Sequence, residues 1–158
     1  MKLTLATKII ADIPTSNGCL YTRDVLEGVI KQFNIRAHKR PVLGSELKPD
    51  DISHLGEPAF VTHRLFINES GAVCADIEIL DNESGKSLQN KIGANSNVIA
   101  RPIMCVPSYV NIEKKHQIAE RGDDVLVIHK INSIVRIQVE CHGEPTGSNK
   151  ENDVGGAK

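Results

Sequence analysis

The sequence predicts an α+β domain: a mostly antiparallel β-sheet or barrel with one amphipathic helix and a short second helix packed outside it. Several segments show the two-residue alternation of apolar side chains that is typical of half-buried strands, and one segment shows helical spacing. Clusters of Gly, Pro and Asn separate these segments. At 158 residues, with 40% hydrophobic and 25% charged residues, the chain has the size and composition of one globular domain.

The N-terminal part predicts a strand, a turn and the main helix. Residues 2–13 alternate at first and predict the opening strand, and residues 14–18 carry the Pro and Asn-Gly chemistry of a turn. In the helix that follows, Thr22 is expected to cap the N-terminus and Asp24 to favour the first turn. The helix is expected to end near Asn34, and its apolar stripe comprises Val25, Leu26, Val29, Ile30 and Phe33.

A long loop and a hairpin are expected next. Prolines and glycines are frequent in residues 41–58, which predicts a loop of functional length. Residues 59–67 and 72–80 predict two strands joined by a turn at 68–71. The second of these strands is expected to bury one face, formed by Val73, Ala75, Ile77 and Ile79.

The C-terminal half predicts a short helix and two further strands. The helix covers residues 85–92, with Leu88 and Ile92 directed inward, and the strands cover residues 97–106 and 124–141. Pro102 has no backbone N–H for a ladder, so we expect it at an edge or a bulge. Two segments are expected outside the sheet: a charged loop at 113–123, and a polar, flexible tail at 143–158 that follows a single domain over 1–142.

Charge and composition argue against several classes of function. The net charge of −1 offers no electrostatic case for nucleic acid or an anionic membrane as the partner. Aromatic side chains are scarce, with no Trp, two Tyr and three Phe, which argues against a base-stacking surface. No apolar run approaches the roughly 18 residues of a membrane span, and the first residues lack the pattern of a signal peptide.

Cysteine and histidine spacing predicts no metal and no cofactor. The four cysteines, at positions 19, 74, 105 and 141, form no Cys-x-x-Cys pair. Since nothing marks the chain as secreted, we expect reduced thiols in a cytoplasmic environment. His129, Cys141 and His142 suggest a metal site only weakly, because adjacent strand residues point to opposite faces. The stretch 81–84 lacks the full ligand set of a calcium loop and is expected to be a turn.

Four segments, in this order, resemble the prohead maturation proteases of tailed bacteriophages. Residues 17–26 are similar to the family's Asn-x-x-x-x-Tyr-Pro turn that leads into a helix, although Thr22 stands where proline is usual. Residues 43–49 are similar to Gly-Glu-Leu-x-His-Pro, and residues 71–88 to a strand and helix start with a Thr-Pro-x-Gly pattern. Residues 97–102 (NVIARP) lie where the family has Gly-Val-Ser-Ser-Arg-Gly. The resemblance implies the assemblin-like serine protease fold.

The departures from the family pattern fall on the residues that the resemblance would make catalytic. Lys48 stands at the position of the general-base histidine, and Ile99 and Ala100 stand at the positions of the nucleophilic serine. Ile and Ala have no atom that attacks a carbonyl, and a charged lysine does not accept a proton. Arg101 matches the family's oxyanion-side arginine, and Glu140 aligns loosely with its acidic residue. The resemblance therefore implies a degenerate protease.

A displaced catalytic pair is the alternative. His54 and His63 flank the degenerate segment, and Ser96 precedes Ile99 by a few residues, so His63 with Ser96 is the candidate pair. The simpler interpretation is that His63 is a partly exposed strand residue and that Ser96 belongs to a turn.

The basic run Arg36, His38, Lys39 and Arg40 is the remaining feature of note. It is either a contact site for an acidic surface or nucleic acid, or a solvated stretch after the helix, and the missing aromatics favour the solvated stretch.

These observations predict a non-catalytic, homo-oligomeric structural protein of a phage head. It would bind capsid or scaffold protein as a decoration or cement protein, in the virion, after assembly in the host cytoplasm. The alternatives are an active maturation protease with a displaced site and a strand-rich binding module of unknown partner.

Overall fold

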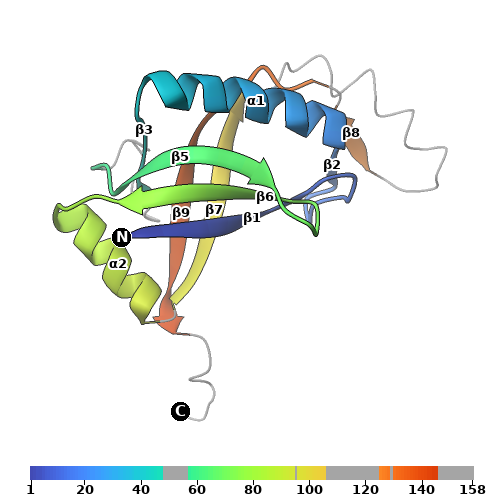
Figure 1. Ribbon diagram of the computed structural model, residues 1–158. Helices are drawn as coiled ribbons and strands as arrows, with labels where there is room; N and C mark the ends of the chain where they lie inside the picture. Colours follow the sequence, from blue (N-terminus) through green and yellow to red (C-terminus); the bar gives the residue numbers. More distant parts are fainter. Residues whose placement is uncertain (48–56, 95, 106–124, 129, 146–158) are drawn as a thin grey trace, which may run out of the picture.

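The computed structural model describes residues 1–47, 57–94, 96–105, 125–128 and 130–145. It confirms the predicted fold class: a seven-stranded mixed sheet, curved into a near-barrel, with two helices outside it (Figure 1). The helices are α1 (Arg23–Lys39) and α2 (Glu83–Gly93). The strands are β1 (Lys2–Ile10), β2 (Cys19–Tyr21), β3 (Val42–Gly44), β4 (Glu46–Leu47), β5 (Phe60–Ile67), β6 (Ala72–Ile79), β7 (Ser96–Cys105), β8 (Leu126–Ile128) and β9 (Ser133–Pro145).

The strand order β3-β5-β6-β1-β7-β9-β4 explains the curvature. β3 pairs with β5 at one edge of the sheet, and β4, which follows after Ser45, pairs with β9 at the other edge. The segment 42–47 thus joins the two edges, and the backbone N–H of Val139 donates to the Ser45 carbonyl at 3.1 Å. The sequence analysis was wrong in assigning 42–47 to a loop. The rest of that predicted loop, from 48 to 56, lies outside the described residues.

The hairpin of β5 and β6 confirms the strand and turn predictions. Asn68 ends β5, and its side-chain carbonyl accepts from Ser70 and Ala72, while Gly71 takes a φ of 85° that favours glycine. The predicted inner face of β6 is buried, and Cys74 is buried as well. The core joins this face to β5, β9 and α1, and its fully buried large side chains include Phe33, Phe60, Leu65, Ile77 and Ile137.

Helix α1 begins where the sequence predicts but continues beyond Asn34. Thr22 is its N-cap, and the predicted stripe residues Leu26, Val29, Ile30 and Phe33 are buried. The helix runs on to Lys39 because Arg36 is anchored: its guanidinium donates to the carbonyls of Ile134 at 2.6 Å and Val135 at 2.8 Å. The basic run therefore forms the last turn of the helix and its C-cap, where cations are favourable.

Helix α2 starts two residues before the predicted 85–92. Asn82 caps it by accepting from Gly85 N–H at 2.7 Å, and it also donates to the Pro58 carbonyl at 2.9 Å. Leu88 is fully buried, and Ile92 is half-buried against the core, as expected.

The predicted strand over 124–141 is in fact two strands, a correction. β8 pairs in parallel with β2 in a separate two-stranded sheet, and β9 begins at Ser133 and pairs with β7. The change of partner occurs at 130–132, where Asn132 donates to the Cys105 carbonyl. β9 continues to Pro145, past the domain boundary expected at 142, and residues 146–158 and the expected loop 113–123 lie outside the described residues.

Candidate functional site

Two of the positions that the protease resemblance makes functional, Glu140 and Ile99, are neighbours on one row of the sheet. Leu47 of β4 pairs with Glu140 of β9, and Glu140 pairs on its other side with Ile99 of β7. Lys48 follows Leu47 directly in the chain but lies outside the described residues. We call this place the β4–β9–β7 row. Residues nearly a hundred positions apart in the sequence become neighbours there, because β4 and β7 flank β9.

The side chains of Ile99 and Ala100 lie on opposite faces of β7. The Ala100 side chain is 2% exposed and belongs to the core, so this position faces the barrel interior. Side chains of successive strand residues point to opposite faces, so Ile99 and Arg101 share the outer face. A serine at position 99 would be accessible, whereas a serine at position 100 would be buried.

An ion pair occupies the outer face beside Ile99. Arg101 donates from Nε to Glu140 Oε1 at 2.6 Å, and His142 Nε2 lies 3.9 Å from the same oxygen. The Arg101 and Glu140 side chains are 51% and 31% exposed, so solvent screens the pair and its contribution to stability is small. The Arg101 guanidinium can donate hydrogen bonds to an anion or a peptide carbonyl, but Arg101, Glu140 and Ile99 supply no hydroxyl or thiol nucleophile.

Two polar groups near the row are also unsuited to nucleophilic attack. Ser45 is buried, and its hydroxyl accepts a hydrogen bond from Gln138 Nε2 at 3.1 Å. Burial, and then the negative charge of Glu46, raise the pKa of the Cys141 thiol to about 11, so this thiol stays protonated at neutral pH.

An open cleft of about 370 Å³ lies on the other side of β7, toward β1. β1 and β7 are paired at Thr7 and Ala100, and the cleft lies where they separate. Its walls include Tyr21, whose burial raises the pKa of its hydroxyl, and the turn that follows β1. The Thr15 hydroxyl in that turn is hydrogen-bonded to Asn17 and to the Cys19 carbonyl.

Pro102, which the sequence analysis expected at an edge or a bulge, lies at this opening, on a strand between β1 and β9 and not at an edge of the sheet. Val139 turns its N–H toward Ser45 and away from β7. Val139 and its partner Ala100 therefore form a pair without hydrogen bonds between β9 and β7, and the backbone polar atoms of Ala100 point away from β9. Because this direction alternates along a strand, those of Pro102, two residues later, also point away from β9. The missing N–H of Pro102 costs no hydrogen bond to β9, and a register shift follows directly at 103–104.

The structure does not bring the displaced-site candidates His63 and Ser96 together. His63 lies on β5 and Ser96 on β7, with β6 and β1 between these strands. The His63 ring bonds Glu78 of β6 at 2.8 Å, and the Ser96 backbone pairs with Pro145. His54 lies outside the described residues.

Cys141 and His142 point to opposite faces of β9, as adjacent strand residues do. Cys141 packs against the core, whereas the adjacent His142 side chain is 58% exposed, and His129 lies outside the described residues. In the part of the chain that the structure describes, no group of three or more His, Cys, Asp or Glu side chains could hold a metal ion. Neither described helix is long and apolar enough to cross a membrane.

Sequence reasoning missed the contacts that surround the row. Lys91 of α2 lies 2.5 Å from Glu46 of β4, whose side chain is 11% exposed, and Gln138 reaches Ser45. Neither contact was predicted, because the sequence analysis assigned residues 42–47 to a loop. The one available signal was Gln138, a polar residue within the apolar run Ile137–Val139, which indicates a buried hydrogen-bond partner.

The near-barrel sheet, its closing segment and the two helices define the class: this is the fold of the phage prohead proteases. The particular structure that it resembles is the capsid assembly protease, gp21, of bacteriophage T4. The TM-score is 0.56, and the match covers 87% of this chain and 80% of the T4 chain at 14% sequence identity. At this identity the likeness shows the fold alone. No protein-family model and no curated protein sequence matches the chain.

Proposed function

We propose that the chain is a non-catalytic structural protein of a tailed-phage head, built on the prohead-protease fold. In this proposal it binds capsid protein as a decoration or cement protein, as a homo-oligomer within the virion, after assembly in the host cytoplasm. In this proposal one domain, which β9 extends to Pro145 and so past the boundary expected at 142, makes these contacts, and the polar segment that follows Pro145 is a flexible tail.

One observation carries the proposal. β4, β9 and β7 pair so that Leu47, Glu140 and Ile99 lie on one row, and in this proposal the family's histidine position is Lys48, its acidic position Glu140 and its serine positions Ile99 and Ala100. Of these, Glu140 alone has a side chain that could serve the protease chemistry, and it is engaged by Arg101. A serine protease needs a nucleophile and a base within hydrogen-bond reach of each other, and Ile99 cannot be that nucleophile.

The alternative, an active maturation protease with a displaced site, is less well supported. His63 is bonded to Glu78, and two strands separate it from the strand of Ser96. A proton cannot pass directly between side chains on strands so far apart, because each strand step adds about 4.8 Å.

The partner class follows from the fold and the lost chemistry. The T4 structure is that of a capsid assembly protease. A chain that keeps this fold without the nucleophile keeps the surface that meets capsid or scaffold protein. In this proposal, binding through that surface is the function that selection maintains.

A binding and cleavage assay with the coat and scaffold proteins of the same phage tests the proposal. We expect the chain to co-sediment with mature capsids and to leave both proteins at their intact masses. His63→Ala and Ser96→Ala variants should bind as the wild type does. Cleavage of either protein that Ser96→Ala or His63→Ala abolishes would overturn the proposal in favour of the displaced protease.

A further inference from the structure

A groove runs along α1 on the side of β5, away from the β4–β9–β7 row. It has a volume of about 700 Å³, and its lining extends from Arg23 to His38 along the helix and includes Ile67 at the end of β5. At 1.5 Å per helical residue the groove is about 22 Å long. We call it the α1 groove.

The floor of the α1 groove is apolar. Ile30 and Ile67 contribute to it, and Ile35 is 52% exposed, one of the few large hydrophobic side chains at the surface of the described residues.

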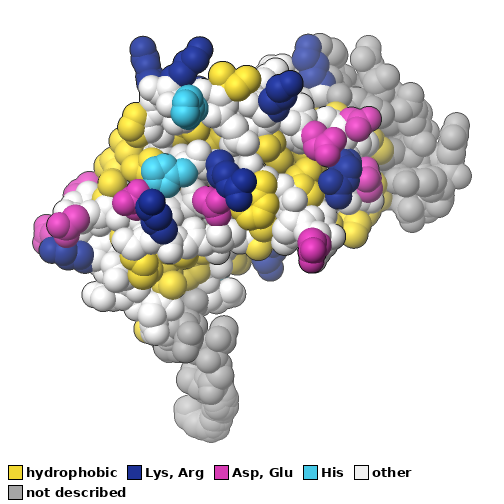
Figure 2. All heavy atoms as spheres, in the orientation of Figure 1, with side chains coloured by type: hydrophobic (Ala, Val, Ile, Leu, Met, Phe, Trp, Pro, Cys, Tyr) yellow, Lys and Arg dark blue, Asp and Glu magenta, His cyan; other side chains and the backbone are white. Residues whose placement is uncertain are grey.

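The rim of the α1 groove is basic. Lys31, His38 and Lys39 line its C-terminal half, whereas its one acidic residue, Glu27, lies 3.7 Å from Arg23 and is paired with it. In Figure 2 the surface over α1 carries Lys, Arg and His side chains around a hydrophobic patch. The chain as a whole has a net charge of −1, so the positive charge of the groove lining is a local feature and does not reflect a basic protein.

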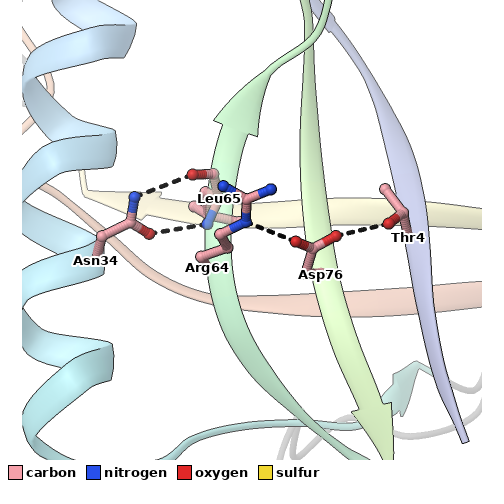
Figure 3. A network of polar contacts seen from close by, with 5 residues as sticks. All are labelled: Thr4, Asn34, Arg64, Leu65 and Asp76. Atoms are coloured by element: carbon pink, nitrogen blue, oxygen red, sulfur yellow. Dashed lines mark hydrogen bonds and ion pairs between the residues drawn. The ribbon is translucent and has the colours of Figure 1, made fainter.

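Asn34 links α1 to β5 and thereby limits the kind of ligand that fits the groove. Its side-chain amide donates to the Leu65 carbonyl at 3.0 Å and accepts from Leu65 N–H at 2.8 Å (Figure 3). β3 pairs with β5 at Phe60–Thr62, so Asn34 takes the place of a neighbouring strand at Leu65. An added β-strand would have to displace this side chain. A helix lying beside α1 would not.

We infer that the α1 groove binds an acidic amphipathic helix of a protein partner, about four turns long. Apolar side chains at helical spacing would cover Ile35 and Ile67, and acidic side chains would meet Lys31, His38 and Lys39. This inference does not depend on the proposed function, because the α1 groove and the β4–β9–β7 row share no residue.

Fluorescence anisotropy with designed peptides tests the inference on the full chain. The probe is a labelled helical peptide of about 16 residues with Leu at every third or fourth position and Glu between them. The control peptide has Lys in place of Glu. We expect the acidic peptide to bind in the micromolar range, and binding should weaken as salt rises from about 50 mM to about 500 mM.

Paired variants locate the site. Ile35→Ser should weaken peptide binding about fivefold or more, and Lys31→Glu with Lys39→Glu about tenfold or more. The matched controls are Leu43→Ser, at a side chain 45% exposed, and Lys86→Glu, at a side chain 68% exposed, and these should leave binding unchanged.

Three results would overturn the inference. They are no binding of the acidic peptide, equal binding of the basic peptide, and equal losses in the control and groove variants. Displacement of the peptide by duplex DNA would show instead that the basic rim is a nucleic-acid surface. A failure of capsid binding with peptide binding intact would count against the proposed function alone.

Discussion

The side-chain alternation along β7 decides which residues could take part in chemistry. Ile99 faces outward beside the Arg101–Glu140 pair, and Ala100 faces the core. Of these two positions, position 99 is the one at which a hydroxyl would be accessible, and the Ile99 side chain has none. The surrounding charges can persist, because Arg101 and Glu140 stabilise each other without a hydroxyl there.

Asp76 links three strands through its carboxylate. It accepts from Thr4 of β1 at 2.6 Å and from Arg64 of β5 at 2.6 Å (Figure 3). The hydrogen bond from Thr4, and then that from Arg64, hold the pKa of this carboxyl below its ordinary value. Because folding lowers the pKa, the contribution to stability is present at neutral pH and is lost as the pH falls through the folded-state pKa.

The Asp76→Asn variant should therefore be less stable than the wild type at pH 7. On acidification its free energy of unfolding should fall by less than that of the wild type. We expect a cost of about 1 kcal/mol at pH 7, since Arg64 is well exposed and the ion pair is screened. At a pH below the folded-state pKa of Asp76 the two proteins should converge. Urea unfolding across this pH range measures the difference, and a constant difference at every pH would contradict the assignment.

The Cys141 thiol should react slowly with alkylating reagents. With a pKa of about 11, only about one Cys141 side chain in a thousand is a thiolate at pH 8. Iodoacetamide should modify the exposed Cys105 well before Cys141 in the native protein, as peptide mass spectrometry can follow. Equal rates would mean that Cys141 is activated and would reopen the question of a cysteine nucleophile.

At the scale of elements, the segment 42–47 closes the sheet. Gly44 allows this closure, because a Cβ there would overlap the Phe60 ring and lie 2.5 Å from the Ile137 carbonyl oxygen. Phe60 is fully buried and pairs with Gly44 across β3 and β5, so the ring cannot move without disturbing the core.

Gly44→Ala should therefore destabilise the fold by about 2–3 kcal/mol through overpacking. The matched control is Gly28→Ala, in open space on α1, which should be neutral or stabilising by up to about 1 kcal/mol. Thermal unfolding of both variants makes the comparison. A neutral Gly44→Ala would mean that β3 and β4 do not close the sheet.

Elements with a strong local pattern were predictable from the sequence, and elements defined by distant partners were not. The stripe from Leu26 to Phe33 and the alternation of β6 each occur within one segment, and both predictions are confirmed. β3 and β4 are three and two residues long and resemble a loop until β5 and β9 pair with them. The break between β8 and β9 lies within a continuous apolar run, so tertiary pairing alone determines it.

The candidate site was predictable in part. The resemblance pointed to Ile99, Arg101 and Glu140, but their meeting with β4 depends on register between segments far apart in the chain. The contacts that engage His63 had a local signal. The His63 and Arg64 side chains on β5 contact Glu78 and Asp76 on β6, a complementary charge pattern across the hairpin.

At the scale of the whole molecule, the two candidate surfaces lie at opposite ends. β9 begins beneath α1 and runs away from it toward α2, so the α1 groove and the outer residues of the β4–β9–β7 row are well separated (Figure 1). A protein with two such surfaces can contact two partners at once.

The tail should be dispensable for folding. Residues 146–158 contain almost no apolar side chain and so have little to add to a core. A chain ending at Pro145 should unfold within about 2 °C of the full chain, since about 1 kcal/mol would shift the midpoint by several degrees. A much lower midpoint would show that the tail is part of the folded domain.

The central claim is that the chain is a structural head protein without protease activity. Quantitative mass spectrometry of purified mature particles tests it most directly, by giving the copy number and the intact mass of the chain. We expect the full-length chain in high copy number in every particle. Its absence from mature particles, or its presence only as trimmed fragments, would contradict this account, because a maturation protease cleaves itself and leaves the head.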